Sequence, residues 1–349
     1  MSGRPLRARK SPPRDDILLG DALTHLTTLP ADSIDCVITS PPYYSLRDYA
    51  SDGQLGMEAN VDQWVDNLAA ISAQVQRILV PTGTFWLNLG DTYAVHPRQG
   101  AQRKNLLLAP ERLAIRLQRD GWIIRNKIAW AKPNPVPTSV ADRLNTTYEL
   151  IYVLARQPRY FFDLDAIREQ HRTIPKTADP AYRTTPEREA WRGPNSMKST
   201  GLASLKAHGR VGHPLGKNPG DVWTITPGGY RSSHHATFPL ALAERMIAAG
   251  CPETRCTHCR LPWRRSVIRD RGRTATRSPL SPTCTCQAGS EPGLVLDPFI
   301  GSGTTAVAAE NLGRDWVGIE LNAEFAADAR ERITKSRAAR SLRNREAAA

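Results

Sequence analysis

Residues 297–305 read Asp-Pro-Phe-Ile-Gly-Ser-Gly-Thr-Thr and directly follow the apolar run 294–296. The apolar run predicts a short buried strand, Gly301 and Gly303 predict a tight turn, and Thr304 is the expected first residue of a helix. A strand, a glycine turn and a helix in this order place backbone N–H groups beside a ligand at the strand's carboxyl end. The stretch therefore predicts an α/β sheet with a ligand site at its edge.

An acidic residue extends this expected site. Glu320 lies 19 residues after Gly301, at the end of the next predicted strand, 316–319. Nucleoside sites place an acid there to accept hydrogen bonds from the ribose hydroxyls. No lysine follows the glycines, so a P-loop is excluded, whereas a nicotinamide cofactor and a purely structural turn stay open.

A second stretch, residues 39–43, reads Thr-Ser-Pro-Pro-Tyr and follows the apolar run 34–38. Its prolines have no N–H, so the carbonyls of Ser40 and Pro41 are expected to be free acceptors. Such acceptors suit the exocyclic amino group of a nucleobase, because they localise the nitrogen lone pair and aim it at an electrophilic methyl group. Tyr43 would stack on a base flipped out of a duplex. The alternative is a strand-ending turn with a packed tyrosine.

The rest of the chain alternates strand-like and helix-like segments. Apolar residues at 64, 68, 71, 75 and 78 predict one buried helix face, and Pro81 and Gly83 are expected to end that helix. This alternation favours a doubly wound, mostly parallel sheet. The other expected strands are 17–19, 84–89, 123–130 and 148–154, and the other expected helices are 110–118 and 238–249.

Composition narrows the class of protein. The chain has 349 residues, 40% of them hydrophobic, and a formal net charge of +13. This charge favours a polyanionic partner, because neutralised phosphates release counterions. No apolar run approaches the roughly 18 residues of a membrane span, and residues 1–14 lack the apolar core of a secretory signal. We expect a cytoplasmic protein with a disordered basic arm at 1–14 and a frayed basic tail at 335–349.

Five of the six cysteines lie between residues 251 and 286. They include two close pairs separated by a 24-residue spacer, Cys256-x-x-Cys259 and Cys284-x-Cys286. In a reducing compartment, two tight thiol pairs predict a tetrahedral structural zinc site. Incidental thiols are the alternative, and Cys251 or His258 could replace one ligand. Cys36 lies in the run 34–38 and is expected to be a buried small hydrophobe.

These motifs resemble those of the β-class DNA amino-methyltransferases, in which the Pro-Pro-Tyr motif precedes the glycine-rich motif in a circularly permuted order. The resemblance implies a class I S-adenosylmethionine-dependent methyltransferase fold. The segments that carry it are 20–22 (Gly-Asp-Ala), 39–43, 83–91, 235–239 (His-Ala-Thr-Phe-Pro), 297–305 and 318–322 (Gly-Ile-Glu-Leu-Asn).

The resemblance also implies the site residues. Residues 297–305 would surround the methionine part of S-adenosylmethionine, Glu320 would bind the ribose, Asp21 would lie by the adenine, and Thr237 with Phe238 would close the pocket. The implied catalytic residues are Ser40, Pro41, Pro42 and Tyr43. The implied donor-binding residues are Asp21, Thr237, Phe238, Asp297, Pro298, Phe299, Gly301, Ser302, Gly303, Thr304, Thr305, Glu320 and Asn322.

Two insertions depart from the family's plainest pattern. Residues 159–222 fall where the family keeps its target-recognition region, and their stretch 166–217 has ten Lys or Arg against four acidic residues; a disordered linker is the alternative. The Cys-rich segment 251–288, with eight Arg against one Asp in 255–277, is expected to be a zinc finger on the DNA backbone or a stabilising insertion. The expected division is 1–14 (arm), 15–158 (catalytic half), 159–222 (target recognition), 223–250 (donor-pocket helix), 251–288 (zinc insertion), 289–334 (donor-binding half) and 335–349 (tail).

The expected function is methylation of cytosine N4 in double-stranded DNA, because Ser40, rather than Asp, at the first motif position is similar to the cytosine-N4 enzymes. Methylation of adenine N6, an RNA or protein amino-methyltransferase, and a non-catalytic zinc-containing DNA-binding protein are the alternatives. By analogy with the family, we expect the protein to form a homodimer and to have a cognate restriction endonuclease as a partner. We expect no association with a membrane.

Overall fold

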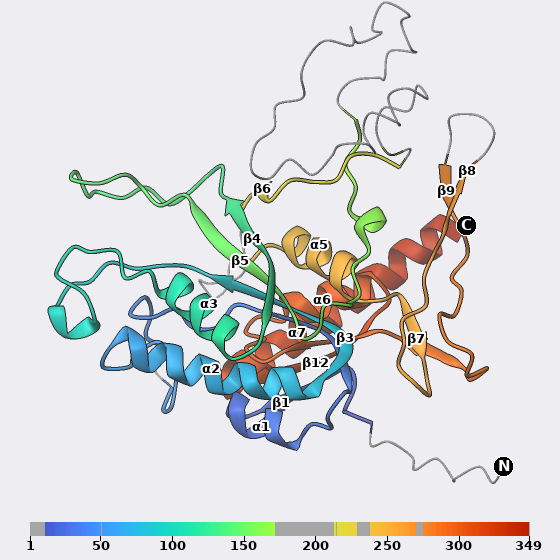
Figure 1. The fold of residues 1–349 in the computed structure, drawn as a ribbon, viewed down its shortest axis with the longest axis horizontal. Helices are drawn as coiled ribbons and strands as arrows, with labels where there is room; N and C mark the ends of the chain where they lie inside the picture. The colour runs from blue at the N-terminus through green and yellow to red at the C-terminus, as the bar shows by residue number, and fades with distance from the viewer. Residues whose placement is uncertain are drawn as a thin grey trace, which may run out of the picture. The chain divides into compact units, whose positions relative to one another are not determined.

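A computed structural model describes residues 11–49, 51–171, 213, 215–228, 238–269 and 275–348. The chain divides into two compact units (Figure 1). The first comprises Met1–Asp163, Gly220–Arg264 and Leu280–Ala349, and the second comprises Leu164–Pro219 and Arg265–Pro279. The first unit contains the large sheet and the candidate site.

An eight-stranded sheet forms the centre of the first unit. Strands β1, β12, β11, β2 and β3 are parallel neighbours, β5 is antiparallel to both β3 and β4, and β6 is parallel to β4. The predicted α/β fold with a mostly parallel sheet is therefore confirmed, with one antiparallel strand inside it. In spatial order the strands are β1 (Asp16–Leu19), β12 (Asp315–Glu320), β11 (Leu294–Asp297), β2 (Ile34–Thr39), β3 (Leu79–Leu89), β5 (Tyr148–Ala155), β4 (Ile123–Ala131) and β6 (Val222–Thr224).

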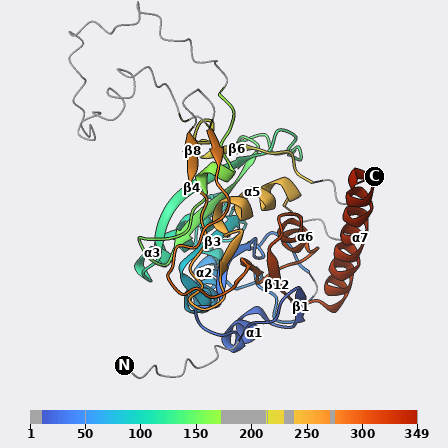
Figure 2. The same cartoon turned by 90° about the vertical axis from the view of Figure 1, so that its right-hand side faces the viewer.

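Helices cover both faces of the sheet, as Figure 2 shows for α2 and α3 on one side and α5 and α6 on the other. Alternate residues of β2 and β3 face opposite layers, because side chains alternate along a strand. Val37 and Phe85 pack with the first layer, whereas Thr84 Oγ1 donates to the Gly250 carbonyl at 3.0 Å in the second and lies 3.5 Å from Cys36 Sγ. The first layer is α1 (Ala22–Thr28), α2 (Val61–Ile78) and α3 (Ala109–Arg119), and the second is α5 (Leu240–Gly250), α6 (Thr304–Asn311) and α7 (Ala323–Ala348).

Helix α2 buries the face that its sequence period predicts. The residues at 64, 68, 71, 75 and 78 are all buried, and Asn60 caps the helix by accepting from the Gln63 N–H at 2.9 Å. The helix ends at Ile78, before Pro81 and Gly83, as predicted, but the predicted start of the next strand at residue 84 is wrong, since β3 begins at Leu79. The backbone becomes extended at Leu79, so both residues lie within β3.

Both expected loose ends are more ordered than predicted. The tail after residue 334 continues as α7 to Ala348, because Arg337 and Arg340 donate to Glu310 of α6 at 2.7 and 3.0 Å. In the expected arm 1–14, Arg14 forms ion pairs with Glu291 and Asp315; residues 1–10 lie outside the described residues. The predictions of fraying at 335–348 and of disorder at Arg14 are therefore corrected.

The two predicted insertions are described in part. Within the expected target-recognition region, the structure describes 159–171, 213 and 215–222, where Glu169 and Lys217 pair through their backbones. Of the Cys-rich insertion, β7 (Thr254–Cys256) pairs with β10 (Ser290–Pro292) in the first unit. The hairpin β8 (Val267–Arg269) and β9 (Ala275–Arg277) belongs to the second unit.

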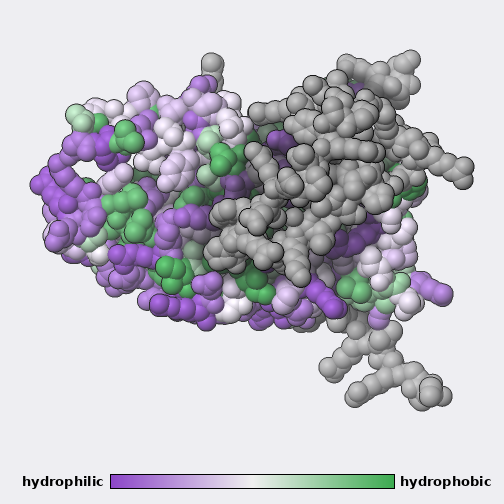
Figure 3. All heavy atoms as spheres, turned by 45° about the horizontal axis from the view of Figure 1, so that its top comes forward, coloured by the Kyte–Doolittle hydropathy of each residue, from purple (hydrophilic) through white to green (hydrophobic). Residues whose placement is uncertain are grey.

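The surface drawn in Figure 3 is mainly hydrophilic where it is described, with hydrophobic residues in small separate groups. Among the described residues, no helix combines the length and the apolar character needed to cross a bilayer.

Candidate active site

The two motifs meet at one edge of the sheet. Strands β2 and β11 are parallel neighbours, so the segments that follow them leave the sheet side by side. Thr39 Oγ1 donates to Asp297 Oδ1 at 2.6 Å, joining residues 258 positions apart. The two stretches therefore converge at the carboxyl ends of neighbouring strands.

Asp297 organises the glycine turn from inside the protein. It is 1% exposed and also accepts from Thr305 Oγ1 at 2.6 Å and from the Phe299 N–H at 3.0 Å. Burial raises its pKa to about 6. Gly301 and Gly303 have φ angles of 49° and 78°, a left-handed conformation that favours glycine. These contacts hold the turn at the start of α6.

Glu320 ties the end of β12 to the same turn. Its Oε2 accepts from the Gly301 N–H at 2.9 Å, and its Oε1 accepts from the Asn322 N–H at 3.0 Å. Burial raises its pKa above the ordinary value. Asn322 in turn caps α7 by accepting from the Glu324 N–H at 2.9 Å. The acid therefore lies where the spacing from Gly301 predicts it.

A cavity of about 350 Å³ opens between the two motifs. Its volume lies in the usual range for sites of small molecules and cofactors. Of the predicted residues, Ser40, Pro42, Asp21, Phe238, Pro298, Phe299, Gly301, Ser302, Thr304, Glu320 and Asn322 line it. Pro41, Tyr43, Asp297, Gly303 and Thr305 are not among its lining residues, and Thr237 lies outside the described residues.

Several lining residues were missed by sequence reasoning. The irregular segment after the Pro-Pro-Tyr motif contributes Tyr49, Ser51, Gln54 and Leu55, and Asn322 donates to Ser51 Oγ at 3.2 Å. This segment has no strand or helix period that could indicate a buried side. Helix α2 adds Asn67, Ala70 and Ile71, and Leu23 and Phe325 add apolar side chains.

A polar network lies behind the Pro-Pro-Tyr motif. Tyr43 Oη donates to Glu149 Oε2 at 2.7 Å and lies 2.9 Å from Ser40 Oγ. Asn88 Nδ2 lies 2.7 Å from Glu149 Oε2 and 2.8 Å from Tyr43 Oη. Lys132 forms an ion pair with Glu149 Oε1. Burial and the adjacent Glu149 carboxylate raise the pKa of Tyr43 well above 10.

Three members of this network, Asn88, Lys132 and Glu149, were not predicted as site residues. Glu149 and Lys132 lie 106 and 89 positions after Tyr43, and only the antiparallel pairing of β5 with β3 and β4 places them nearby. One signal was available in the sequence, because Glu149 is a carboxylate within an otherwise apolar strand.

The Pro-Pro-Tyr motif is fixed on its other side as well. Trp64 of α2 donates from Nε1 to the Pro42 carbonyl at 2.9 Å. Trp64 is fully buried, so this contact anchors the motif to the first helix layer. The carbonyls that are expected to accept from a base are those of Ser40 and Pro41. The Pro42 carbonyl is not one of them, so its bond to Trp64 does not compete with that role.

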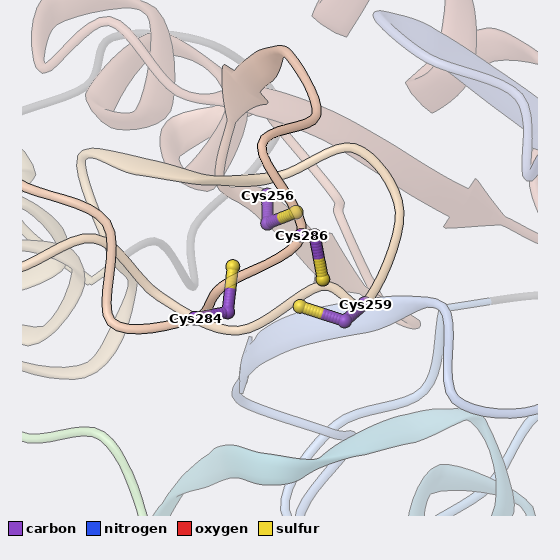
Figure 4. Close-up of side chains that lie close together, drawn as sticks. All are labelled: Cys256, Cys259, Cys284 and Cys286. Carbon is purple, nitrogen blue, oxygen red and sulfur yellow. The ribbon is translucent and has the colours of Figure 1, made fainter.

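Four thiols gather in the first unit. The Sγ atoms of the predicted pairs all lie within 4.8 Å of one another, and Figure 4 shows them facing a common centre. All four are free cysteines. Thiolates at this spacing can bind a soft divalent metal such as zinc. The members are Cys256, Cys259, Cys284 and Cys286.

Comparison with known proteins identifies the family. A family model described as DNA methylase matches residues 34–331. The chain belongs to the DNA methylase family. Among its curated relatives is Type II methyltransferase M.SmaI of Serratia marcescens, 33% identical over 343 residues, which cover 92% of this chain and 91% of the relative. M.Cfr9I of Citrobacter freundii is 31% identical over 88% of this chain and 83% of its own.

Solved structures show that this DNA methylase shares a known fold. The PvuII DNA methyltransferase (cytosine-N4-specific) superposes with a TM-score of 0.56 at 18% identity, covering 95% of this chain and 94% of that one. A putative DNA modification methylase from Thermus thermophilus, complexed with S-adenosyl-L-methionine, gives a TM-score of 0.52 at 21% identity over 92% and 93% of the two chains. The predicted DNA amino-methyltransferase is confirmed at the level of the family.

Proposed function

We propose that this DNA methylase transfers the methyl group of S-adenosylmethionine to N4 of a cytosine flipped out of double-stranded DNA. One observation carries the proposal: a single cavity is lined by the glycine turn and by Ser40 and Pro42 of the acceptor motif. A donor in this cavity would hold its methyl group beside the residues suited to grip an amino group. Ser40 at the first motif position favours cytosine N4 over adenine N6.

The lining residues divide between the parts of the donor. Glu320 would accept from the ribose hydroxyls, because its carboxylate still has lone pairs beyond those that meet the Gly301 and Asn322 N–H groups. Asp21 would lie by the adenine, and Phe238 would cover the pocket together with Thr237. The turn residues would surround the methionine part, with Asp297, Gly303 and Thr305 supporting the turn from behind. S-adenosylmethionine supplies the electrophilic methyl group.

The acceptor motif would orient the base. Ser40 Oγ and the Pro41 carbonyl would accept from the amino group and localise its lone pair toward the methyl group. The amino nitrogen would gain the methyl group as the bond between that methyl group and the sulfonium sulfur breaks, S-adenosylhomocysteine would leave, and the nitrogen would lose one proton to water. Pro42 would keep the turn rigid, and Tyr43 would contact the base ring. Carbon-5 methylation would need a thiol nucleophile, and Cys36 is fully buried in β2.

A nucleoside assay tests this function. Duplex DNA is incubated with the protein and S-adenosylmethionine, digested, and separated into nucleosides by mass. Formation of N4-methyldeoxycytidine supports the proposal, and formation of N6-methyldeoxyadenosine supports adenine as the target base. The absence of both methylated nucleosides would overturn both readings. RNA and single-stranded DNA, assayed in parallel, show whether the duplex is the preferred substrate.

We also propose that the four thiols hold a structural zinc ion. Tetrahedral zinc with Zn–S bonds of about 2.3 Å needs sulfur atoms about 3.8 Å apart, which is compatible with the 4.8 Å limit of the cluster. Metal analysis should find one zinc per chain, and Cys259→Ser or Cys286→Ser should lower that content. Cys36→Ala, which removes a buried cysteine of β2 outside the cluster, is the matched control. Zinc-free protein would refute the assignment.

The contacts of the insertion favour a stabilising role for it over a role as a DNA-binding finger. Arg255 is 1% exposed and bonds to Asp35 at 2.6 Å and to Glu291 at 2.8 Å. Arg260 donates to the Asp32 carbonyl. These two of the eight arginines in 255–277 therefore anchor the insertion to the sheet, and we propose that zinc stabilises this anchor.

The proposed partner is double-stranded DNA read at a specific site, with residues 159–222 as the target-recognition region. The curated relatives are named Type II methyltransferases, which supports a cognate restriction endonuclease as a second partner. That pairing is tested by digesting host DNA with the candidate restriction endonuclease, with and without prior methylation by this protein. Prior methylation should protect the DNA from cleavage. Self-association as a homodimer is tested by sedimentation of the full chain.

A further inference from the structure

We propose that Glu149 is a positioning residue that fixes the direction of the Ser40 hydroxyl proton, so that Ser40 offers only lone pairs to the amino group of the base. The inference rests on the proposed function and names a residue that the motif pattern does not include. The donors and acceptors of the network behind the motif support it.

Glu149 determines where the first proton of the network points. The carboxylate forms an ion pair with Lys132 through Oε1, and it accepts hydrogen bonds but donates none. Tyr43 Oη lies 2.7 Å from Glu149 Oε2. Two oxygens at this distance need a proton between them, and the raised pKa of Tyr43 keeps its phenol protonated. The single Tyr43 proton therefore points at Glu149.

The proton of Ser40 is then determined. Ser40 Oγ lies 2.9 Å from Tyr43 Oη, and either atom could donate on distance alone. Because Tyr43 has already given its proton to Glu149, Ser40 must be the donor. Its hydroxyl proton consequently points into the network, and its lone pairs are left for other partners.

Asn88 reinforces this arrangement. Its Nδ2 lies 2.7 Å from Glu149 Oε2, 2.8 Å from Tyr43 Oη and 3.3 Å from Ser40 Oγ, and all three atoms can accept. A flipped amide would put Oδ1 against the Glu149 carboxylate, which cannot donate. Within the described residues the present orientation leaves Asn88 Oδ1 buried without a partner. The amide of Asn88 therefore keeps its N–H₂ group toward Glu149, although this leaves its buried Oδ1 without a hydrogen bond.

The direction of the proton matters because Ser40 lines the cavity. A hydroxyl that presented its proton there would repel the N–H groups of the target amino group. A hydroxyl that presents lone pairs accepts from the amino group and keeps its nitrogen lone pair directed at the methyl group. Glu149 acts on the reaction only through Tyr43 and Ser40.

A set of substitutions in the full-length protein tests this inference. Glu149→Gln keeps the shape of the side chain but introduces an N–H₂ group that faces donors. It should lower kcat for DNA methylation by about tenfold to hundredfold, as expected for a bond to a charged group. The affinity for S-adenosylmethionine, measured by calorimetry, and the melting temperature should change little. Glu111→Gln, which breaks the 2.7 Å ion pair between Glu111 of α3 and Lys127 of β4, is the matched control and should retain full activity.

Double substitutions distinguish positioning from general stability. In the Ser40→Ala background, Glu149→Gln should reduce kcat by no more than about twofold, because the hydroxyl to be directed is gone. Tyr43→Phe, which interrupts the relay but keeps the ring, should likewise abolish the effect of Glu149→Gln. A full effect of Glu149→Gln in either background would overturn the inference, as would wild-type turnover in the single variant.

The same data separate the inference from the proposed function. Wild-type protein that forms methylated bases, together with a Glu149→Gln variant of unchanged turnover, refutes the positioning role alone. Wild-type protein that binds S-adenosylmethionine yet methylates neither cytosine nor adenine refutes the proposed function, and the role of Glu149 falls with it.

Discussion

The ring of Tyr43 lies directly against the backbone of Gly90. A Cβ atom at position 90 would lie 2.6 Å from Tyr43 Cε2 and 2.8 Å from Cδ2, which is closer than carbon atoms pack. Because the Tyr43 hydroxyl is also hydrogen-bonded to Glu149 and Asn88, the ring cannot move away from Gly90 without breaking these bonds. Glycine at position 90 is therefore a requirement for the observed position of the tyrosine.

Gly90→Ala should displace the Tyr43 ring and lengthen its bonds to Glu149 and Ser40. We expect kcat to fall by about tenfold or more, with the affinity for S-adenosylmethionine retained, because Gly90 does not line the cavity. Steady-state kinetics and calorimetry give the two quantities. Gly220→Ala is the control, since a Cβ there would meet nothing within 4 Å; equal turnover in both variants would contradict the packing role of Gly90.

Glu320→Gln should weaken binding of S-adenosylmethionine by about tenfold to hundredfold, since the amide would turn one N–H₂ group toward backbone donors or the ligand. The carboxylate now meets the N–H groups of Gly301 at 2.9 Å and Asn322 at 3.0 Å. Calorimetric titration measures the loss. Glu324→Gln, an exposed change on the first turn of α7, should bind the donor normally, and an equal loss there would point to a general charge effect.

Asp297 should make folding stability depend on pH. Burial raises its folded pKa from 3.8 to about 6, so the folded state holds the proton more tightly than the unfolded state. The resulting stabilisation is complete below about pH 4 and is lost as pH rises through 6, by an amount on the order of 3 kcal/mol. Asp297→Asn should remove this dependence. Urea unfolding of both proteins from pH 4 to 7 gives the difference, and parallel curves would rule the prediction out.

Arg255→Met should destabilise the protein by about 3–5 kcal/mol, because it leaves a buried carboxylate without its charge partner. Arg255 bonds to Asp35 at 2.6 Å, and the pKa of Asp35 is already raised to about 6 by burial against the lowering effect of Arg255. The loss should be larger at pH 8 than at pH 5, where Asp35 can take up a proton. Urea unfolding at both pH values measures it. Arg116→Met, which breaks exposed ion pairs with Asp66 and Asp120, should change the free energy of unfolding far less than Arg255→Met, because solvent screens exposed charges.

The sequence predicted those parts of the site that are encoded locally. The apolar run, the two glycines and Glu320 lie within 27 residues, from 294 to 320, and each has a strand or turn signal of its own. The four cysteines were also recognisable, because close pairs have few other uses in a reducing compartment. Such features can be predicted without knowing which strands become neighbours in the sheet.

The remaining features depend on pairing between distant segments. Glu149 contacts Tyr43 only because β5 runs antiparallel to β3, and no period in either segment predicts that neighbour. The order of α7 comes from Glu310 of α6, which binds Arg337 and Arg340, whereas the sequence after residue 334 shows only basic character. The lining from Tyr49 to Leu55 is irregular and is positioned by its contact with Asn322.

The strand order also bears on how the chain folds during synthesis. Strands β12 and β11 lie between β1 and β2 in the sheet, although they are made more than 250 residues later. The strands β1 and β2 therefore have unpaired edges until β11 and β12 have been synthesised, and exposed strand edges promote mispairing. The donor pocket cannot close before β12 is in place, so a growing chain is kept from modifying DNA until Glu320 has been synthesised.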